Sequence, residues 1–442
     1  MTRLFGTDGV RGIANADLTA ELAFKLGQAG ASVLSRGRGG AFVIGKDTRI
    51  SGDMLEAALA AGICSVGSQA LKVSVLPTPA IAYLTKALKA DGGVVISASH
   101  NPAEYNGIKF FGPDGFKLAD SVEDEIEAAM EAHKDLPTGS SIGTVRSSKG
   151  ATDLYIDHVV NTIEGNLEGL RVAIDCGHGA AYQVSPVVFR QLGAEVMAVN
   201  TSPNGTNINL GCGSTHIDYI QEIVISHDVD IGFAHDGDAD RVIAVDETGE
   251  VVDGDFMLAI CALHLKNRGR LPKNSLITTV MANLGFDLAM REYGIDIVKT
   301  KVGDRYVLEE MLKRDVTIGG EQSGHIIFLE HNTTGDGIIT ALQLASVMMQ
   351  TGSRLSELKK IMDKLPQILV NVNVKGINGW QEIPSIKESI ARAEKEIGSR
   401  GRILVRPSGT EPLIRVMVES DSGDSASFIA HSIADVIRRE LG

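Results

Sequence analysis

Apolar runs of about five residues alternate with longer, helix-like segments along most of the chain. Residues 41–45 and 92–96 are two of these runs, and residues 54–66 between them have the pattern of a helix. Buried strands that alternate with helices are typical of α/β folds with parallel strands. The pattern continues through the middle of the chain, where six further strands are predicted at residues 171–175, 195–199, 229–234, 276–280, 295–299 and 316–318.

The C-terminal part has a different pattern. Residues 368–374 and 413–418 alternate apolar and polar positions, as half-exposed strands do, and residues 425–441 form an amphipathic helical pattern. These features predict a small α+β module with an antiparallel sheet. Polar or turn-rich stretches near residues 138–152, 251–255 and 364–366 are candidate boundaries. We therefore expect four domains, at residues 1–150, 151–250, 251–366 and 367–442.

Composition narrows the class of protein. The 442 residues are 43% hydrophobic and 22% charged, with a formal net charge of −14, which argues against general binding of nucleic acid or of an acidic membrane. A local cluster of Arg and Lys could still bind a small anion. The four cysteines have no CxxC spacing, no apolar leader opens the chain, and the apolar segment 337–349 is too short to cross a bilayer. We expect a cytoplasmic protein with reduced, buried thiols.

A serine-bearing loop follows the predicted strand at residues 92–96. Its sequence is Ser97-Ala-Ser-His-Asn-Pro102, and Asn106-Gly-Ile-Lys109 comes shortly after it. A serine presented at a strand end beside His100 and Lys109 could carry a covalent group. An ordinary loop is the alternative, because Ser, Asn and Pro are common in loops for conformational reasons alone.

An acidic loop, Asp236-Gly-Asp-Ala-Asp-Arg241, joins two further apolar runs. Three carboxylates at alternate positions can direct oxygen atoms to one hard cation, which favours Mg²⁺. An EF-hand is excluded, because Arg241 stands where that loop requires Gly and residues 242–245 have the pattern of a strand. A solvated acidic turn is the remaining alternative.

Three other segments carry candidate chemistry. Arg406-Pro-Ser-Gly-Thr-Glu411, with Arg415, offers the donors of an anion clamp, although a turn with surface arginines is the alternative. Gly319-Gly-Glu-Gln-Ser-Gly-His325 could bind sugar hydroxyls, and Phe5-Gly-Thr-Asp-Gly-Val-Arg-Gly12 presents Arg11. No Walker loop occurs. Together these parts favour phosphoryl transfer involving a phosphosugar.

Five motifs in this order resemble the α-D-phosphohexomutase superfamily: FGTDGVRG, SASHNP with NGIK, DGDADR, GEQSGH and RPSGTEP. The resemblance spans nearly the whole chain, and the first and fourth motifs most resemble the bacterial branch that acts on glucosamine phosphate. It implies an α/β fold of three related domains with mixed sheets and a smaller C-terminal α+β domain, arranged around a central cleft. The phosphoserine, metal, sugar and phosphate loops would lie in the first to fourth domains in turn.

The resemblance also implies a role for each matching residue. Ser99, directly before His100, would be the phosphorylated serine, and with its phosphate it would join Asp236, Asp238 and Asp240 in binding one Mg²⁺ per chain. Arg11, His100, Lys109 and His325 would lie near the transferring phosphate, with Lys109 and Arg11 suited to handling protons. Because neighbouring side chains diverge in an extended loop, His100 is expected to point away from Ser99. The substrate would be bound by Arg241, Glu321, Ser323, His325, Arg406, Ser408, Gly409, Thr410 and Arg415.

The implied activity is the interconversion of glucosamine 6-phosphate and glucosamine 1-phosphate for UDP-N-acetylglucosamine synthesis. It would proceed through phosphorylated Ser99 and a bisphosphorylated hexosamine, which is both intermediate and activator. A phosphoglucomutase or phosphomannomutase of the same superfamily is the alternative. A phosphosugar-binding regulator and a phosphatase are two further readings, from other functional classes. Partners are expected to be the phosphosugar and a second copy in a homodimer, with neither nucleic acid nor membrane.

Overall fold

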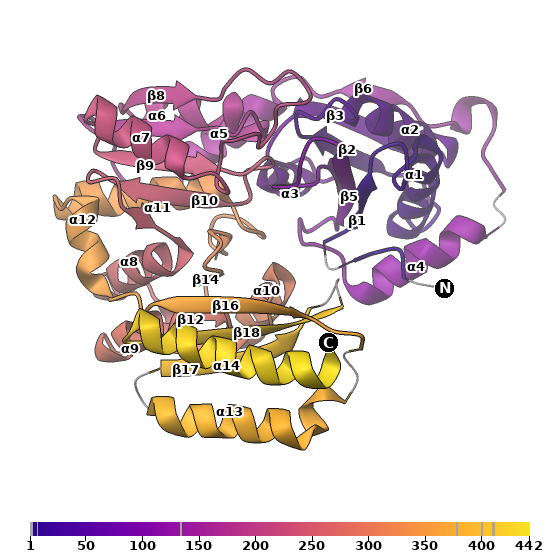
Figure 1. The fold of residues 1–442 in the computed structure, drawn as a ribbon. Coiled ribbons are helices and arrows are strands. Elements are labelled where there is room, and N and C mark those ends of the chain that lie inside the picture. Colours follow the sequence, from indigo (N-terminus) through magenta and orange to yellow (C-terminus); the bar gives the residue numbers. More distant parts are fainter. Residues whose placement is uncertain (1–2, 7, 133–134, 377–378, 399–400, 409–411) are drawn as a thin grey trace. The chain divides into compact units, whose positions relative to one another are not determined.

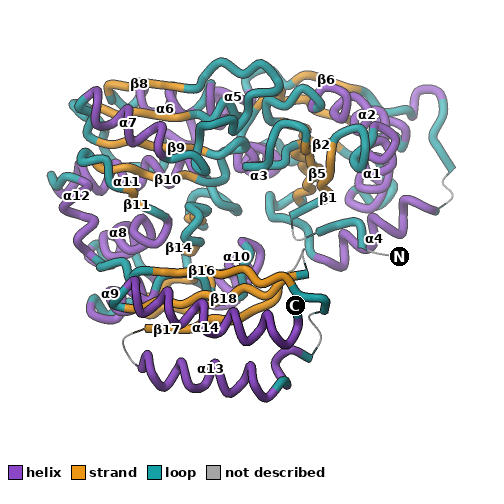
Figure 2. The backbone as a smooth tube through the Cα atoms, viewed as in Figure 1, coloured by secondary structure: helices purple, strands orange, loops and turns teal. Residues whose placement is uncertain are grey.

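The computed structural model describes residues 3–6, 8–132, 135–376, 379–398, 401–408 and 412–442. The chain forms two compact units (Figures 1 and 2). Unit 1 comprises Met1–Val280 and Ile295–Lys360, and unit 2 comprises Met281–Gly294 and Ile361–Gly442.

The first sheet of unit 1 has six strands in the order β1-β5-β4-β2-β3-β6. Its strands are β1 Val10–Ile13, β2 Ala41–Lys46, β3 Gln69–Val75, β4 Gly92–Ile96, β5 Tyr105–Phe111 and β6 Val145–Ser147. Helices α1 Ala20–Leu34, α2 Gly52–Ser65 and α4 Asp120–Glu131 share one core with one face of this sheet, and α3 Thr78–Ala87 packs on the other. Glycine permits that second contact, because a Cβ at Gly45 would lie 2.2 Å from Ile81 of α3. Both faces of β4 are therefore buried.

The second sheet has five strands in the order β11-β10-β9-β7-β8. Its strands are β7 Arg171–Asp175, β8 Glu195–Val199, β9 Ile231–His235, β10 Val242–Asp246 and β11 Val251–Val252. Helix α6 Ser185–Gln191 places Phe189 against Phe233 on one face, with ring centroids 5.5 Å apart. Helix α7 Asp218–His227 packs around Ala234 on the other. Neighbouring positions of β9 thus enter opposite cores, as strand geometry requires.

The third sheet has four strands in the order β13-β12-β14-β15. Its strands are β12 Ser275–Thr279, β13 Asp296–Thr300, β14 Ile318–Gly320 and β15 Ile326–Phe328. Unit 1 also contains α5 Ala151–Val160, α8 Gly254–Asn267, α10 Asp304–Arg314, α11 Gly337–Thr351 and α12 Leu355–Leu358. Helix α10 packs through Val307 and Met311 on the face of β12 that carries Ile277.

Unit 2 contains an antiparallel sheet in the order β16-β18-β17. Its elements are α9 Leu284–Glu292, β16 Gln367–Asn373, α13 Pro384–Ile397, β17 Gly401–Pro407, β18 Leu413–Ser420 and α14 Gly423–Leu441. Alternate strand residues and the two long helices enclose one apolar core around Val416, Ile433 and Trp380. Leu284 of α9 donates its backbone N–H to buried Glu419 of β18, which joins this short helix to the sheet.

These observations confirm the predicted fold class. Each of the three larger sheets mixes parallel and antiparallel pairs, and the C-terminal sheet is antiparallel. All four cysteines are buried and free of disulfide bonds, as predicted. Within the part of the chain that the structure describes, no helix is both long and apolar enough to cross a membrane.

Candidate active site

The serine-bearing loop begins directly after β4, and Ser99 is 1% exposed within it. The backbone of Ser99 has φ 51°, in the left-handed region that L residues other than Gly, Asn and Asp seldom adopt. Its hydroxyl donates to Asp236 Oδ2 over 2.5 Å, and its backbone N–H donates to Ser97 Oγ over 3.0 Å. The loop thus turns the Ser99 hydroxyl toward the acidic loop.

The expected divergence of Ser99 and His100 is wrong. Ser99 Oγ and His100 Nδ1 lie 3.3 Å apart, because the left-handed turn at Ser99 replaces the extended backbone that we assumed. Arg241 Nη1 lies 3.4 Å from the same ring nitrogen. Since arginine can only donate, a hydrogen bond between these two groups requires Nδ1 to accept, as it does in a neutral ring. Burial, then the charges of Arg241 and Arg11, lower the pKa of His100 and favour the same state.

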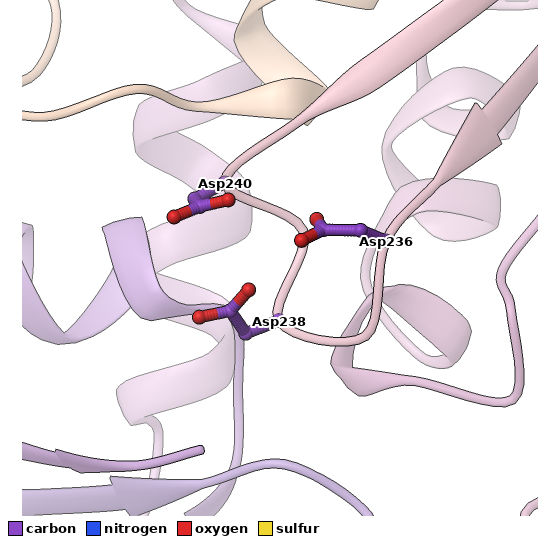
Figure 3. Close-up of side chains that lie close together, drawn as sticks. All are labelled: Asp236, Asp238 and Asp240. Carbon is purple, nitrogen blue, oxygen red and sulfur yellow. The ribbon is translucent and has the colours of Figure 1, made fainter. Parts of the chain in front are cut away.

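The acidic loop joins β9 to β10, which pair as an antiparallel hairpin. Asp236, Asp238 and Asp240 are buried, and each offers a carboxylate oxygen within 4.8 Å of the others. Figure 3 shows the three carboxyl groups pointing toward one another from this loop. Asp238 Oδ1 and Asp240 Oδ1 are buried and accept no hydrogen bond from the described residues.

This donor set fits a hard cation. Burial and the neighbouring charges of Asp240 and Asp238 raise the pKa of Asp236 well above its ordinary value. Buried, unpartnered carboxylate oxygens are costly in a folded protein, whereas Mg²⁺ prefers oxygen ligands of this kind. The three carboxyl groups therefore form a candidate metal site. The alternative of a solvated acidic turn is rejected, because all three groups are buried.

Cationic side chains lie beside the three carboxyl groups. Lys109 of β5 is 2% exposed, and its Nζ lies 3.1 Å from Asp238 Oδ2 and 2.9 Å from Asp8 Oδ2. Burial alone would lower the pKa of Lys109, but Asp238 and Asp8 raise it above the ordinary value. Arg11 of β1 also pairs with Asp8, and β1 is held against β5 by the pairing of Arg11 with Gly107. The end of the opening motif, from Val10 to Gly12, therefore belongs to a strand of the sheet.

The fourth motif completes the site within unit 1. His325 is buried, and its Nε2 lies 3.5 Å from Asp304 Oδ2 and 3.9 Å from Asp240 Oδ2. Glu321 Oε1 accepts the backbone N–H of Gly303 over 3.1 Å. His325 and Glu321 line a pocket of about 330 Å³ together with Arg11, Asp240 and Arg241. Ser323 is exposed on the same loop and is not among the described residues that line the pocket.

The predicted anion clamp lies in unit 2. Arg406 of β17 and Arg415 of β18 are directly opposite in the antiparallel register, and Asn371 of β16 continues the row. Burial and the charge of Arg415 lower the pKa of Arg406. Ser408 is 5% exposed and donates its backbone N–H to Leu413. Two guanidinium groups at opposite positions of neighbouring strands are the kind of donors that an anion clamp requires. Gly409 and Thr410 lie outside the described residues.

Sequence reasoning missed three charged residues of the site. Asp8 joins Lys109 to Lys117, with its Oδ1 2.8 Å from Lys117 Nζ, and Lys117 also contacts Asp304. Asp304 in turn faces His325. Asp8 stands between glycines in the opening motif, which is a signal that could have identified it. Lys117 and Asp304 stand in segments that resemble ordinary turns and helix ends, so nothing in their neighbourhoods distinguishes them.

Family models match four consecutive parts of the chain. Residues 2–136, 153–249 and 253–365 match the models described as phosphoglucomutase/phosphomannomutase, alpha/beta/alpha domains I, II and III. Residues 369–436 match the model of the C-terminal domain of the same family. The serine, acidic, sugar and phosphate loops therefore lie in four different matched domains, one loop in each.

Known proteins agree with these matches. The proteins named phosphoglucosamine mutase from Symbiobacterium thermophilum and from Thermoanaerobacter sp. are 57% and 54% identical to this chain, each over the full length of both proteins. A crystal structure of a phosphoglucomutase/phosphomannomutase family protein from Burkholderia thailandensis has the same fold, with a TM-score of 0.83 and 24% identity, over 99% of this chain and 98% of that one. The chain therefore belongs to the phosphoglucomutase/phosphomannomutase family, within the α-D-phosphohexomutase superfamily.

Proposed function

We propose that this protein interconverts glucosamine 6-phosphate and glucosamine 1-phosphate, and that Ser99 carries the phosphoryl group between turnovers. Full-length identity of 54–57% to proteins named phosphoglucosamine mutase favours this substrate over those of a phosphoglucomutase or phosphomannomutase. The observation that carries the proposal is the Ser99 hydroxyl, which lies 2.5 Å from Asp236 of the buried carboxylate cluster. Such an enzyme would serve UDP-N-acetylglucosamine synthesis.

The choice of Ser99 over Ser97 rests on their contacts. Ser97 Oγ donates to buried Asp47 over 2.6 Å and accepts the N–H of Ser99, so its hydroxyl is engaged in holding the loop. Ser99 Oγ instead faces the carboxylate cluster and His100. A phosphoryl group on Ser99 would therefore extend into the charged site.

Transfer from Ser99 breaks the bond between phosphorus and Ser99 Oγ and forms a bond from phosphorus to the free hydroxyl oxygen of the sugar. The sugar hydroxyl loses its proton, Ser99 ends as a hydroxyl, and the product is a bisphosphorylated hexosamine. The same step run backwards with the other phosphate of that hexosamine reloads Ser99. Binding of the bisphosphate to dephosphorylated enzyme would also make it an activator.

Charge stabilisation and positioning are the main tasks in such a transfer. Asp236, Asp238 and Asp240 would hold Mg²⁺, with phosphorylated Ser99 as a further ligand. When bound, Mg²⁺ supplies positive charge beside the phosphoryl oxygens. Lys109, which Asp8 and Asp238 keep protonated, adds positive charge from β5 and can act as a proton donor. Arg11, His100, Arg241 and His325 contact this group of charges and complete the phosphate environment.

The remaining predicted residues bind the substrate in this proposal. Glu321 and Ser323 would accept and donate hydrogen bonds to the sugar. Arg406, Ser408 and Arg415, with Gly409 and Thr410 of the same loop, would bind the phosphate that is not reacting. The direct opposition of Arg406 and Arg415 supports this role, because two adjacent guanidinium groups favour a bound dianion.

We also propose the wider setting of the protein. The domain limits 1–150, 151–250, 251–366 and 367–442 are supported by the four matched ranges. A cytoplasmic location is supported by four free cysteines, because such thiols persist in reducing compartments. A homodimer remains a proposal, and sedimentation of the purified protein tests it.

The test of function is turnover of glucosamine 6-phosphate with Mg²⁺, measured beside glucose and mannose phosphates and combined with intact-mass analysis. Wild type should prefer the amino sugar and carry one phosphate increment. Ser99→Ala should lose both turnover and the increment, while Ser97→Ala should keep the increment. Full turnover by Ser99→Ala would overturn the carrier mechanism, and a preference for glucose or mannose phosphate would overturn the substrate assignment.

A further inference from the structure

The backbone of the serine loop is held by two side chains from segments that follow strands of two different sheets. The carbonyl oxygen of Ser99 accepts Arg49 Nη2 and Asn209 Nδ2, each over 2.9 Å. The carbonyl oxygen of Asn101 accepts the same two groups, over 2.8 and 3.2 Å. Arg49 follows β2 of the six-stranded sheet, and Asn209 follows β8 of the five-stranded sheet.

Arg49 is buried and makes almost all its contacts with this loop. Besides Ser99 and Asn101, its guanidinium donates to the carbonyls of Pro102 and Tyr105, the latter over 2.9 Å. Its Nε donates to Asp47 Oδ2 over 2.8 Å. A planar fork with five N–H donors can hold several carbonyls at once, which lysine cannot do.

Asp47 also helps to fix the backbone N–H of Ser99, through the side chain of Ser97. Its Oδ2 accepts Ser97 Oγ over 2.6 Å, and Ser97 Oγ accepts the Ser99 N–H over 3.0 Å. Both peptide groups of Ser99 are therefore fixed, the carbonyl directly and the N–H through Ser97. This agrees with its left-handed backbone, which persists only where the surroundings determine it.

Asn209 lies where the serine loop and the acidic loop pack together. It is 7% exposed, and because carbonyl oxygens only accept hydrogen bonds, its amide nitrogen must be the atom that faces them. The backbone of the acidic loop packs against the same place, since a Cβ at Gly237 would lie 2.5 Å from Ser99 O and 2.9 Å from Asn209 Nδ2. Asn209 thus fixes the serine loop at its contact with the carboxylate cluster.

We propose that Arg49 and Asn209 are positioning residues for phosphoryl transfer, which together hold Ser99 so that its oxygen faces the carboxylate cluster. The proposal rests on the proposed function of Ser99. Neither side chain need touch the substrate. Their loss should therefore slow transfer far more than it weakens binding of the sugar phosphate.

The test compares Asn209→Asp with Asn207→Asp, and Arg49→Lys with Arg38→Lys. Asn209→Asp keeps the shape but replaces the amide donors with a carboxylate. Among the described residues, the hydrogen bonds of the Asn207 side chain are to Ser202 and Asn204 of its own loop. Arg38 is exposed. Each test variant should lower kcat by about 100-fold, the effect of a displacement of about 1 Å, and change KM less than about threefold. The two controls should stay within about twofold of wild type.

Two further measurements separate positioning from general instability. Hydrogen exchange of the amides of residues 99–105 in substrate-free protein should accelerate about tenfold in the test variants and stay unchanged elsewhere. Because Arg49 and Asn209 act on the same carbonyls, the double variant should lose much less activity than the product of the two single losses. Equal changes in kcat and KM, multiplicative losses, or wild-type kcat in Asn209→Asp would each overturn the proposal.

The outcomes distinguish this proposal from the function on which it rests. If wild type carries phosphate and is active but both test variants match it, positioning by Arg49 and Asn209 is wrong and the carrier function stands. If Ser99→Ala keeps full turnover, the carrier function is wrong. Faster exchange in residues 99–105 would then still show that the two side chains hold the loop, although not for catalysis by Ser99.

Discussion

Replacement of Gly237 by alanine should separate the serine loop from the acidic loop. The backbone of Gly237 is outside the left-handed region, so the added methyl group is the whole perturbation. It would lie 2.5 Å from Ser99 O and 2.8 Å from Ile208 Cδ1. Both neighbours are buried, and the first is a backbone atom, which cannot rotate away as a flexible side chain can.

The size of the effect follows from these distances. A carbon–oxygen contact is comfortable at about 3.3 Å, so the loops must move apart by about 0.8 Å. A displacement of this size at a transfer site lowers kcat by about 100-fold. Overpacking of this kind costs about 1–3 kcal/mol of unfolding free energy. The folded state should therefore survive while activity is largely lost.

The assay is turnover of glucosamine 6-phosphate with thermal unfolding in parallel. Gly423→Ala is the matched control, because within the described part of the chain a Cβ there would meet Pro366 alone, at 3.8 Å. It should retain wild-type turnover. Turnover of Gly237→Ala within about threefold of wild type would show that the two loops need not meet as closely as the structure indicates, and it would refute the reasoning.

Five other predictions follow from the structure. Arg406→Ala should raise KM for the sugar phosphate about tenfold without reducing the phosphate increment on Ser99, and an unchanged KM would contradict the clamp. Mg²⁺ at about 100 times its Kd should stabilise the protein by about 2.7 kcal/mol in thermal unfolding, and Asp240→Asn should remove most of that gain. Protein stripped with EDTA should also accept phosphate from the bisphosphate more slowly, as intact mass can record. Glu419→Ala removes a buried carboxylate that accepts Arg402 Nη2 over 2.9 Å and the backbone N–H of Leu284 over 3.0 Å, and it should destabilise unit 2 by about 3 kcal/mol. Fluorescence of the single tryptophan, Trp380, monitors the unfolding, and a loss below about 1 kcal/mol would contradict this. Burial raises the pKa of Cys212 and Cys261 to about 12, so at pH 8 almost none of either thiol is ionised, and a maleimide should modify them only after unfolding.

Strands with a largely apolar run could be predicted from sequence, and in β4 and β7 this run reflects burial. The predicted strands 92–96, 171–175 and 195–199 agree with β4, β7 and β8 at both ends. Strands β1 and β5 were not predicted, since each carries polar or glycine residues; β5 pairs with β4, and β1 pairs with β5. Their pairing is tertiary information, and it places Arg11 and Lys109 on neighbouring strands.

The candidate site also contains some residues that the sequence could identify and others that it could not. Ser99 and the three aspartates stand in short segments with a visible chemical pattern, so sequence alone could nominate them. Arg49 and Asn209 act on backbone carbonyls of a distant loop, and no local pattern reveals such a partner. The orientation of His100 was predicted wrongly because it depends on one left-handed residue, Ser99, whose conformation is imposed by those same contacts.

The charges of unit 1 explain why the metal and the phosphoryl group should depend on each other. Five carboxyl groups and four cations form one connected cluster: Asp8, Asp236, Asp238, Asp240, Asp304, Arg11, Lys109, Lys117 and Arg241. Counted as ionised, the five carboxylates and the four cations nearly balance, with one negative charge in excess. A phosphoryl group on Ser99 would bring about two negative charges into this buried, balanced site, and Mg²⁺ would bring two positive ones. Loading either alone leaves an uncompensated buried charge, whereas loading both keeps the site near neutrality. Slow phosphorylation without Mg²⁺ would therefore be a consequence of charge balance, even though the loops that present Ser99 are already in place.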